Sequence, residues 1–193
     1  MINIATTIKA IVDIIQPFDD IERDIKLDVI DWVDSGAQLF RISKPDNPNK
    51  HLVSYFVLFD DINNSVLLID HIKSHLWLPT GGHVDIDEDP YDTAVREAYE
   101  ELHITADFTT PFGSNPFFVT ATVTNGCGYH TDVSLWYIIK GDSTKELWFD
   151  KQEMNGYKWL TLDEILLTDI STMDEQMHRF TNKMKQFLDR TNK

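Results

Sequence analysis

The sequence predicts an α/β/α sandwich, in which a mixed β-sheet lies between helices and follows an N-terminal helical extension. Strand-like segments precede and follow one amphipathic helix in the middle of the chain, and another amphipathic helix closes it. Each of these helices has an apolar stripe that needs a sheet face for burial, so both faces of the sheet should be covered. With 193 residues, of which 42% are hydrophobic, the chain can form one domain with an appendage.

The first part of the chain predicts two short amphipathic helices. Isoleucine and valine recur at helical intervals from Ile4 to Ile15, Pro17 interrupts the pattern, and Ile21 to Val33 resumes it. We assign residues 1–45 to an N-terminal helical extension and residues 46–193 to the main domain. Because an apolar stripe needs burial, we expect the extension to cap the sheet. Lengthening a cleft and forming a homodimer contact are the alternatives.

The remaining elements follow in the order that a mixed sheet requires. The apolar runs Leu52 to Phe59 and Val66 to Ile69 flank the turn-rich segment 60–64, so they predict a β-hairpin. Further elements are expected at Pro116 to Val123, at Asp132 to Ile139, around Trp159 and Leu160, at Asp163 to Leu167, and from Met177 to Leu188.

The central helix is expected to begin at Pro90. Asp89 is a favourable N-cap, and proline suits the first helical position because its missing N–H would be unpaired there anyway. The predicted buried stripe consists of Ala94, Val95, Ala98 and Leu102. Upstream of the helix, the glycine pair Gly81 and Gly82 permits a close approach of the backbone to a bound group.

Three glutamates share one edge of this helix. Glu97 lies three and four residues before Glu100 and Glu101, so their carboxylates are neighbours. Each exposed like-charge pair costs roughly 0.2–0.5 kcal/mol, which a bound cation would offset. Mg²⁺ and Mn²⁺ prefer such oxygen ligands. A solvated acidic helix face is the alternative reading of the glutamates alone.

The segment from Gly82 to Ile104 resembles the Nudix box of the Nudix hydrolases. The matching residues are Gly82, Glu88, Arg96, Glu97, Ala98, Glu100, Glu101 and Ile104. The departure is His103, which stands where the family has glycine. Glycine would end the helix in a left-handed conformation, which histidine adopts at some cost. We therefore expect His103 to mark the helix end and to leave the site intact, although a catalytic or ligand role for it is the alternative.

The resemblance implies a Nudix-type fold and a metal-dependent hydrolase. Such an enzyme would cleave a phosphate–phosphate bridge in a nucleoside diphosphate linked to a further group X, for example a nucleoside triphosphate or a related nucleotide. The implied ligands of Mg²⁺ or Mn²⁺ are the Gly81 carbonyl group, Glu97, Glu100 and Glu101. The implied catalytic group is Glu97, Arg96 and Glu153, with Gly82 and Glu88 supporting the box.

Glu153 is the candidate for a general base outside the box. It lies six residues before Trp159, a spacing similar to that of a catalytic glutamate in the triphosphate-cleaving branch of the family. A base within the box, or a solvated loop carboxylate at Glu153, are the alternatives.

Substrate contacts are expected from polar and aromatic residues of a later strand. Alternation along this strand places His130 and Asp132 on one face, directed either to solvent or to the cleft. Phe117, Phe118 and Tyr129 could stack a base, and burial in the core is the alternative for these aromatic residues. We include His83, next to the glycine pair, with these substrate-binding candidates. A nucleoside triphosphate, a dinucleoside polyphosphate and a nucleotide sugar all remain compatible with the sequence.

A zinc site made from the histidines nearest in sequence is not expected. His71, His75 and His83 have no cysteine nearby, and two of them fall in a segment that reads as strand and turn. We interpret them as scattered loop histidines.

Composition limits the partners of the protein. The formal charge of −15 argues against binding a nucleic-acid polymer, and a phosphorylated small molecule would need a metal ion to dock. No stretch reaches membrane-spanning length, and the single cysteine, Cys127, cannot form an intramolecular disulfide. A small-molecule nucleotide partner, no membrane and a cytoplasmic location are therefore expected.

Two other functions remain open. The protein could be a non-catalytic Nudix-like module that senses a nucleotide. It could instead be an isomerase acting on an isoprenoid diphosphate, a related fold in which a cysteine assists proton transfer, and Cys127 alone keeps this alternative open.

Overall fold

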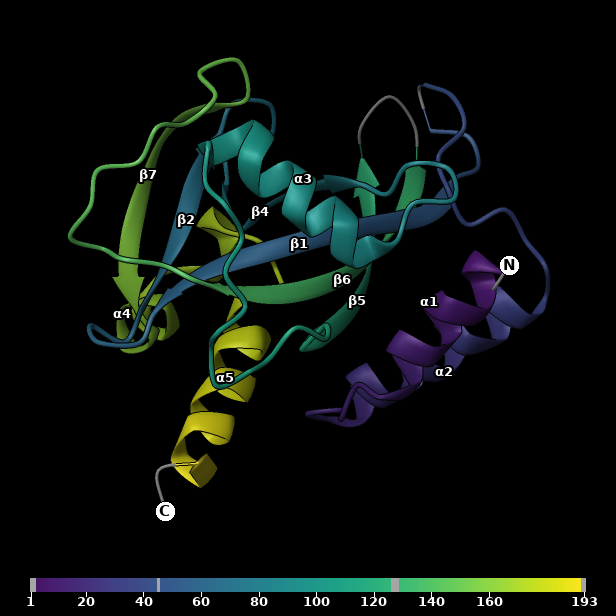
Figure 1. Cartoon of the computed structure of the whole chain (residues 1–193), viewed down its shortest axis with the longest axis horizontal. Coiled ribbons are helices and arrows are strands. Elements are labelled where there is room, and N and C mark those ends of the chain that lie inside the picture. Colours follow the sequence, from purple (N-terminus) through teal and green to yellow (C-terminus); the bar gives the residue numbers. More distant parts are fainter. Residues whose placement is uncertain (1–2, 45, 126–128, 192–193) are drawn as a thin grey trace. The chain divides into compact units, whose positions relative to one another are not determined.

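The computed structural model describes residues 3–44, 46–125 and 129–191, so Cys127 lies outside the described residues. Figure 1 labels the main elements along the chain. The helices are α1 (Ile4–Asp13), α2 (Asp20–Asp34), α3 (Pro90–Leu102), α4 (Leu162–Leu167), the short 3₁₀ helix η1 (Ile170–Thr172) and α5 (Met177–Thr191). The strands are β1 (Lys50–Asp60), β2 (Ser65–His71), β3 (Trp77–Leu78), β4 (Thr80–His83), β5 (Phe118–Asn125), β6 (Tyr129–Lys140) and β7 (Met154–Thr161).

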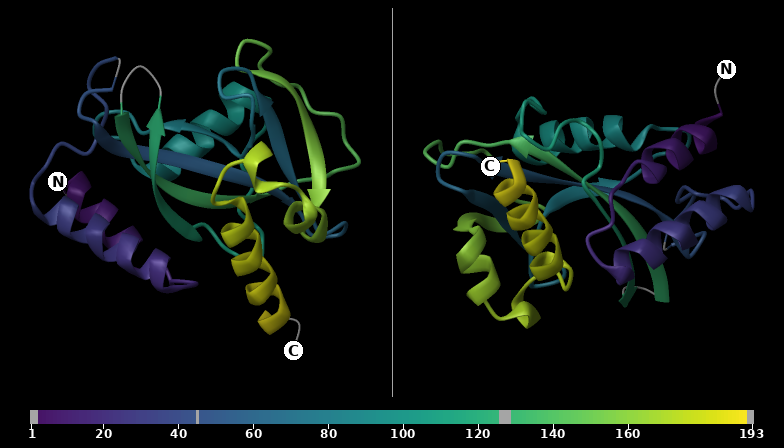
Figure 2. Two further views of the ribbon diagram at one scale, coloured as in Figure 1. Left: turned by 180° about the vertical axis from the view of Figure 1, so that it is seen from behind. Right: turned by 90° about the horizontal axis from the view of Figure 1, so that it is seen from below.

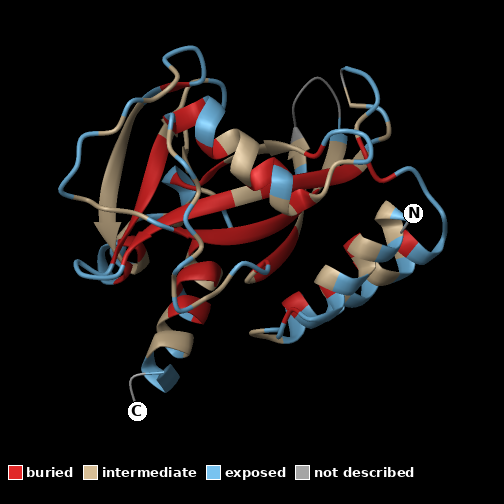
Figure 3. Ribbon diagram, in the orientation of Figure 1, coloured by how far each residue is buried: buried red, intermediate tan, exposed pale blue. Residues whose placement is uncertain are grey.

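The chain forms two compact units. The first comprises residues 1–55, 81–97 and 114–137, and the second comprises residues 56–80, 98–113 and 138–193. Hydrogen bonds connect the strands in the order β3-β2-β1-β6-β5, with β4 paired to β1 and β7 paired to β2. Figure 3 shows that the buried residues concentrate on the strands.

The N-terminal helices pack on strand β5 in the first unit. Helices α1 and α2 contact each other, as the views in Figure 2 show, and α2 also contacts β5, the last strand in the order of the sheet. Glu22 of α2 is fully buried, and its carboxylate accepts hydrogen bonds from the N–H groups of Phe18 at 2.6 Å and Val119 at 3.3 Å. A side chain of α2 thus satisfies a backbone donor of an edge strand, where unpaired N–H groups are a liability. Helix α2 thus lies against the last strand of the sheet.

Strands β5 and β6 form an antiparallel pair that fixes which side chains face each other. Phe118 lies opposite Trp136, and their rings pack edge to face, with centroids 5.7 Å apart. The indole N–H of Trp136 donates to Thr120 Oγ1 at 3.0 Å. Both aromatic residues are fully buried, so they belong to the core. Towards the other end of the pair, the residues opposite each other become polar, with Thr122 opposite Asp132 and Thr124 opposite His130.

The second unit is built around strand β2. It pairs antiparallel with β1, β3 and β7, and the β1–β2 pairing of Phe59 with Val66 confirms the predicted hairpin. Helices α4 and α5 contact each other in this unit. The buried side chains of α5 include Met177, Phe180 and Met184, as the closing amphipathic pattern predicted. No described helix has both the length and the apolar composition that crossing a bilayer requires.

The predicted stripe of α3 needs one correction. Ala94, Ala98 and Leu102 are buried, but Val95 is only partly buried, and Thr93 is buried in addition. Val95 was assigned to the buried stripe because its side chain is apolar. The threonine can be buried because its hydroxyl group donates to the Glu88 carboxylate at 2.7 Å, so no polar group is left unsatisfied.

The β1–β2 turn depends on Asp60, whose side chain is 2% exposed. Its carboxylate accepts from the N–H groups of Ile62, Asn63 and Ser143 and from the side chains of Asn63 and Ser143, at 2.6–3.0 Å. Burial raises the pKa of this carboxyl, but the hydrogen bonds from Ser143 and Asn63 outweigh it and hold the pKa below its usual value.

We expect Asp60→Ala to lower the free energy of unfolding by about 2–4 kcal/mol, because five backbone and side-chain donors lose a buried, charged acceptor. Urea unfolding at neutral pH measures this difference. The exposed neighbour provides the control, since Asp61→Ala should change stability by less than about 0.5 kcal/mol. A depressed carboxyl pKa contributes stability above the unfolded pKa only, so the difference should shrink as pH falls below about 4. A stable Asp60→Ala protein at neutral pH would contradict this role.

Candidate active site

The loop before α3 lies tightly against strand β1. Gly81 has φ +138°, and a Cβ there would meet the carbonyl oxygen of Ser54 at 2.2 Å. The hydroxyl group of Ser54 in turn donates to the Pro90 carbonyl group at 2.7 Å, which holds the start of α3 against the same strand. Strand β1 therefore positions both the glycine pair and the beginning of the glutamate helix.

Helix α3 begins as the sequence predicted. Asp89 accepts a hydrogen bond from the Tyr91 N–H at 2.9 Å through its carboxylate, and its carbonyl group accepts from the Thr93 N–H at 3.0 Å. These are the bonds of an N-cap residue followed by proline at the first helical position.

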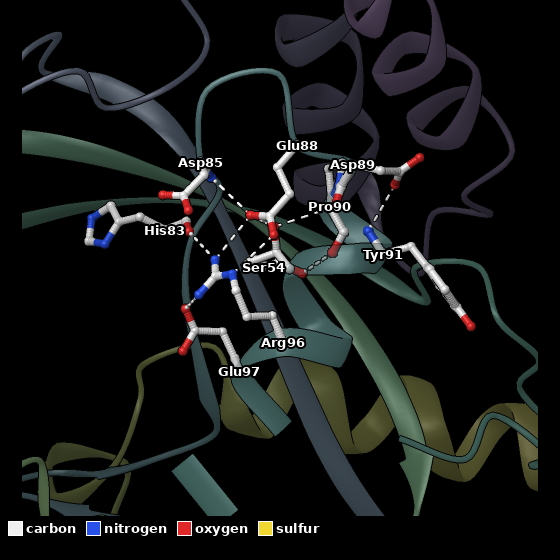
Figure 4. A network of polar contacts seen from close by, with 10 residues as sticks. Ser54, His83, Asp85, Glu88, Asp89, Pro90, Tyr91, Arg96 and Glu97 are labelled. Carbon is white, nitrogen blue, oxygen red and sulfur yellow. Dashed lines mark hydrogen bonds and ion pairs between the residues drawn. The ribbon is translucent and has the colours of Figure 1, made fainter. Parts of the chain in front are cut away.

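Arg96 is the centre of a polar network, which Figure 4 shows. Its Nε donates to Glu88 Oε1 and its Nη2 to Glu88 Oε2, each at 3.0 Å, so the pair is bidentate. Burial raises the pKa of the Glu88 carboxyl, but the hydrogen bonds from Arg96 and Thr93 outweigh it and hold that pKa below its usual value. Arg96 Nη2 also donates to the His83 carbonyl group at 3.2 Å. The guanidinium thereby joins the loop to the helix.

The carboxylate of Glu97 is held between Arg96 and the glycine pair. Arg96 Nη1 donates to Glu97 Oε1 at 2.7 Å, and the Glu97 side chain is only 13% exposed. A Cβ at Gly82 would lie 2.1 Å from that oxygen, so no other residue fits there without moving the carboxylate. Because Glu88 and Glu97 both accept from Arg96, their orientation is set before any ligand binds.

Glu100 and Glu101 occupy the last turn of the same helix. The helical repeat places them on the edge of α3 that Glu97 shares. Glu101 is 6% exposed, whereas Glu100 is exposed. The backbone at Glu101 is also fixed, since its carbonyl group accepts from the Asp150 N–H at 2.9 Å.

His103 ends α3 in the left-handed conformation that the sequence predicted, with φ +51°. Its N–H donates to the Tyr99 carbonyl group at 3.0 Å. Its ring stacks on Trp148, with centroids 3.5 Å apart and planes 3° apart. This aromatic contact, which the sequence did not predict, offsets part of the cost of a Cβ at a positive φ.

Glu153 lies in the turn before β7 and is exposed. Its N–H donates to the Asp150 carbonyl group at 3.2 Å, and its carbonyl group accepts from the Ile72 N–H at 2.9 Å. Since the Asp150 N–H donates to the carbonyl group of Glu101, this turn is fastened to the C-terminal end of α3.

The substrate-binding candidates separate into two groups. His83, His130 and Asp132 lie in one polar cluster with His51 and Asp46, whereas Tyr129 is 78% exposed at the start of β6. His51 Nε2 lies 3.1 Å from Asp132 Oδ1, and His130 Nδ1 lies 3.4 Å from Asp46 Oδ2. The sequence analysis missed His51 and Asp46, because nothing in their local pattern relates them to residues some eighty positions later.

The pKa values of His51 and His83 are shifted in opposite directions. Burial lowers the pKa of His51, but the adjacent Asp132 carboxylate and the Pro48 carbonyl group outweigh it and raise that pKa. Burial and the nearby Arg41 lower the pKa of His83 to about 4, so His83 is neutral at pH 7.

The family follows from comparison with known proteins. The family model described as the NUDIX domain matches residues 50–183, well over half of the chain and including the whole glutamate helix. The chain belongs to the Nudix family. Membership typically brings dependence on a divalent metal ion.

Solved Nudix structures share the fold. This Nudix chain is similar to a hydrolase of the NUDIX family from Clostridium perfringens, with 19% identity, a TM-score of 0.55 and coverage of 70% of this chain and 97% of that chain. It is also similar to a C. elegans Ap4A hydrolase, with 22% identity, a TM-score of 0.55 and coverage of 72% and 97%. A third similar structure is a MutT NUDIX hydrolase from Burkholderia pseudomallei, with 20% identity, a TM-score of 0.54 and coverage of 68% of this chain and 95% of that chain. No curated protein matches the chain. The predicted α/β Nudix fold with a mixed sheet, preceded by helices, is confirmed.

The residues of the Nudix box fit a hard divalent cation. Three carboxylates and a backbone carbonyl group supply only oxygen, which is the ligand set of Mg²⁺ and Mn²⁺. The space beside Gly82, which a Cβ would fill, is taken by the Glu97 carboxylate. Glycine at this position therefore leaves room for the Glu97 carboxylate.

We expect Gly82→Ala to weaken Mn²⁺ binding by about 10–100-fold, the usual effect of disturbing the support of a metal ligand. The added Cβ displaces the Glu97 carboxylate from its place beside Arg96. Titration of Mn²⁺ by electron paramagnetic resonance measures the affinity. Gly156→Ala is the matched control, because a Cβ there meets nothing within 4 Å and binding should be unchanged. Equal affinities in the two variants would refute the steric role of Gly82.

Proposed function

We propose that this Nudix protein is a hydrolase that cleaves a phosphate–phosphate bridge in a nucleoside diphosphate linked to a further group X. The observation that carries the proposal is the Glu97 carboxylate, which is fixed by Arg96 and fitted against Gly82 at the head of the three-glutamate edge. A structural helix has no need of such an arrangement. A surface salt bridge contributes about 0–1 kcal/mol, whereas here one guanidinium orients two carboxylates and holds a backbone carbonyl group.

Glu97, Glu100, Glu101 and the Gly81 carbonyl group are the proposed ligands of Mg²⁺ or Mn²⁺. When bound, the ion supplies Lewis-acid polarisation of the phosphoryl oxygens and a water of lowered pKa. Glu97 and Glu101 enter this site from partly and fully buried positions, so their carboxylates are held in place. Arg96 acts as a positioning residue, since it donates to the carboxylates of Glu88 and Glu97 and to the His83 carbonyl group.

The charge of the protein favours a substrate that arrives with its metal ion. A net charge of −15 repels a free nucleotide, and in the network the single positive charge of Arg96 faces two carboxylates. Positive charge at the glutamate edge therefore has to come from the cation. This reasoning agrees with a small phosphorylated substrate and disfavours a nucleic-acid polymer.

We propose Glu153 as the general base that takes a proton from the attacking water. The turn that carries it is fastened to the end of the glutamate helix through Asp150 and Glu101. Its side chain is exposed and so can reorient towards a bound substrate. Glu97 is the alternative base, but its Oε1 already accepts from Arg96, which favours a role as ligand.

The extension has a structural role in this proposal. We propose that residues 1–45 cover the edge of the domain formed by residues 46–193, since the Glu22 carboxylate accepts from the backbone N–H of Val119 in β5. This leaves the glutamate helix as the element that carries the chemistry.

The test is an assay of product identity. The purified chain is incubated with Mg²⁺ or Mn²⁺ and a nucleoside triphosphate, a dinucleoside tetraphosphate, a nucleotide sugar or an isoprenoid diphosphate, and the products are identified by mass spectrometry. Cleavage of a phosphate bridge supports the hydrolase. Tight binding without turnover would favour a nucleotide-sensing module, and double-bond migration would favour the isomerase, whose candidate cysteine, Cys127, lies outside the described residues.

We expect Glu101→Gln to reduce kcat by at least about 100-fold, because a buried metal ligand loses its charge. Glu153→Gln should reduce kcat by about 10²–10⁴-fold with little change in Mn²⁺ affinity, as removal of a general base does. The control is Glu146→Gln, an exposed glutamate of the loop before β7, which should leave kcat unchanged. Retention of most turnover in Glu153→Gln would remove it as the base, and retention in Glu101→Gln would refute the assigned metal site.

A further inference from the structure

A second group of ligand-type side chains lies in the first unit, apart from the glutamates. His51 of β1, His83 of β4 and Asp132 of β6 each offer one ligand atom, and these three atoms lie within 4.8 Å of one another. His51 is fully buried, and the other two residues are partly buried. Three separate strands thus bring two imidazoles and a carboxylate to one place.

These side chains present polar atoms that no described protein group satisfies. His51 Nε2, His83 Nε2 and Asp132 Oδ1 are buried, and none has a hydrogen-bond partner among the described residues. His51 Nε2 and Asp132 Oδ1 are 3.1 Å apart, but they do not align as a hydrogen bond. Leaving one buried polar group unsatisfied costs about 1–3 kcal/mol, so three at one place require an explanation.

The tautomer of His51 is suited to metal binding. Its Nδ1 lies 2.8 Å from the carbonyl oxygen of Pro48, which can only accept, so Nδ1 carries the hydrogen. In the neutral ring the lone pair is then on Nε2, which faces Asp132. Metal-binding histidines commonly donate their other N–H to a backbone carbonyl group in this way.

The carboxylate of Asp132 is also held from its other side. Asp132 Oδ2 lies 3.5 Å from His130 Nε2, and that nitrogen lies 2.5 Å from Thr124 Oγ1. The remaining oxygen, Oδ1, is the one that faces His51. Asp132 therefore lies between two histidines, with Oδ1 near His51 and Oδ2 near His130.

An ion pair between His51 and Asp132 explains only part of this arrangement. A protonated His51 could pair with the carboxylate, yet Nε2 of His83 would still be buried without a partner. A divalent cation bound by all three residues satisfies the three atoms together. In Figure 4 the His83 ring is directed away from Arg96, so this ring is free of the network around the glutamates.

We propose that His51, His83 and Asp132 bind a divalent transition-metal ion of the zinc class, at a site separate from the glutamate edge. Imidazole nitrogen suits zinc, whereas Mg²⁺ prefers oxygen ligands. Two histidines and a carboxylate form a known zinc ligand set that leaves the fourth position open. Bonds of about 2.0–2.1 Å in a tetrahedron separate the ligand atoms by roughly 3.3 Å, close to the 3.1 Å between His51 and Asp132.

Two of these residues were substrate-binding candidates from the sequence, and their role changes in this proposal. His83 and Asp132 hold the ion and do not contact the nucleotide directly. Because β1, β4 and β6 each contribute one ligand, the ion fastens these strands near the point where Gly81 meets β1.

The test uses Zn²⁺ and Co²⁺ as probes on the full chain, with Mg²⁺ in excess to occupy the glutamates. We expect one equivalent of Zn²⁺ by isothermal titration calorimetry and the visible absorption of four-coordinate Co²⁺. His51→Gln and Asp132→Asn should each weaken Zn²⁺ binding by about 100-fold or more, since a direct ligand matters at least as much as its support. His75→Asn, an exposed turn histidine at φ +58° where asparagine is tolerated, is the matched control.

A substitution in the Nudix box should not abolish metal binding by His51, His83 and Asp132. Glu100→Gln should leave the Co²⁺ spectrum unchanged, which separates this proposal from the proposed hydrolase. The proposal is overturned if the wild-type chain binds no Zn²⁺, or if Glu100→Gln abolishes binding while His51→Gln does not. If both ligand variants fail to fold, X-ray absorption spectroscopy of the zinc-loaded wild-type chain tests the proposal. We expect two imidazole ligands on the zinc ion, and coordination by oxygen alone would refute the site.

Discussion

The bidentate ion pair between Arg96 and Glu88 is the interaction on which the rest of the site depends. One guanidinium donates to two carboxylates and to the His83 carbonyl group, so the loop 83–88 and helix α3 are fixed to each other. Desolvated charges are costly unless they are paired with good geometry. Here the pairing also leaves Glu97 oriented, and the missing side chain of Gly82 leaves room for its oxygen, which a Cβ there would approach to 2.1 Å. Local charge compensation thus orients a proposed metal ligand in a strongly acidic protein.

Features that follow from local rules could be predicted from the sequence. The start of α3 depends on the capping chemistry of Asp89 and Pro90, and its end depends on the backbone preference of His103, so both are correct to the residue. The hairpin after β1 is likewise encoded by adjacent turn residues. Val95 was wrong because apolarity does not show which side of a helix a hydrogen-bonded threonine will take.

Features that arise from pairing between distant strands could not be predicted in this way. Zinc was not expected because His71, His75 and His83 lack ligand spacing along the chain. The interpretation of all three as loop histidines was wrong, since His71 ends β2 and His83 ends β4. His83 instead lies with His51 and Asp132, and their strands bring the three together only when the sheet forms. The stack of His103 on Trp148 has the same origin, since a loop residue far along the chain covers the helix end. Side-chain type is visible in a sequence, but strand register is not.

His83 links the two sites through one residue. Its carbonyl group accepts from Arg96, which orients Glu97, while its ring belongs to the group with His51 and Asp132. The backbone of His83 adjoins Gly82, where an added Cβ would lie 2.1 Å from Glu97 Oε1. Any effect on hydrolysis of an ion bound by His51, His83 and Asp132 should therefore pass through the backbone at residues 82–83. It should appear first in the position of the Glu97 carboxylate. An effect of this kind should alter metal affinity at the glutamates before it alters the chemistry, because Glu97 is a proposed ligand of the metal ion and Arg96 is proposed to position it.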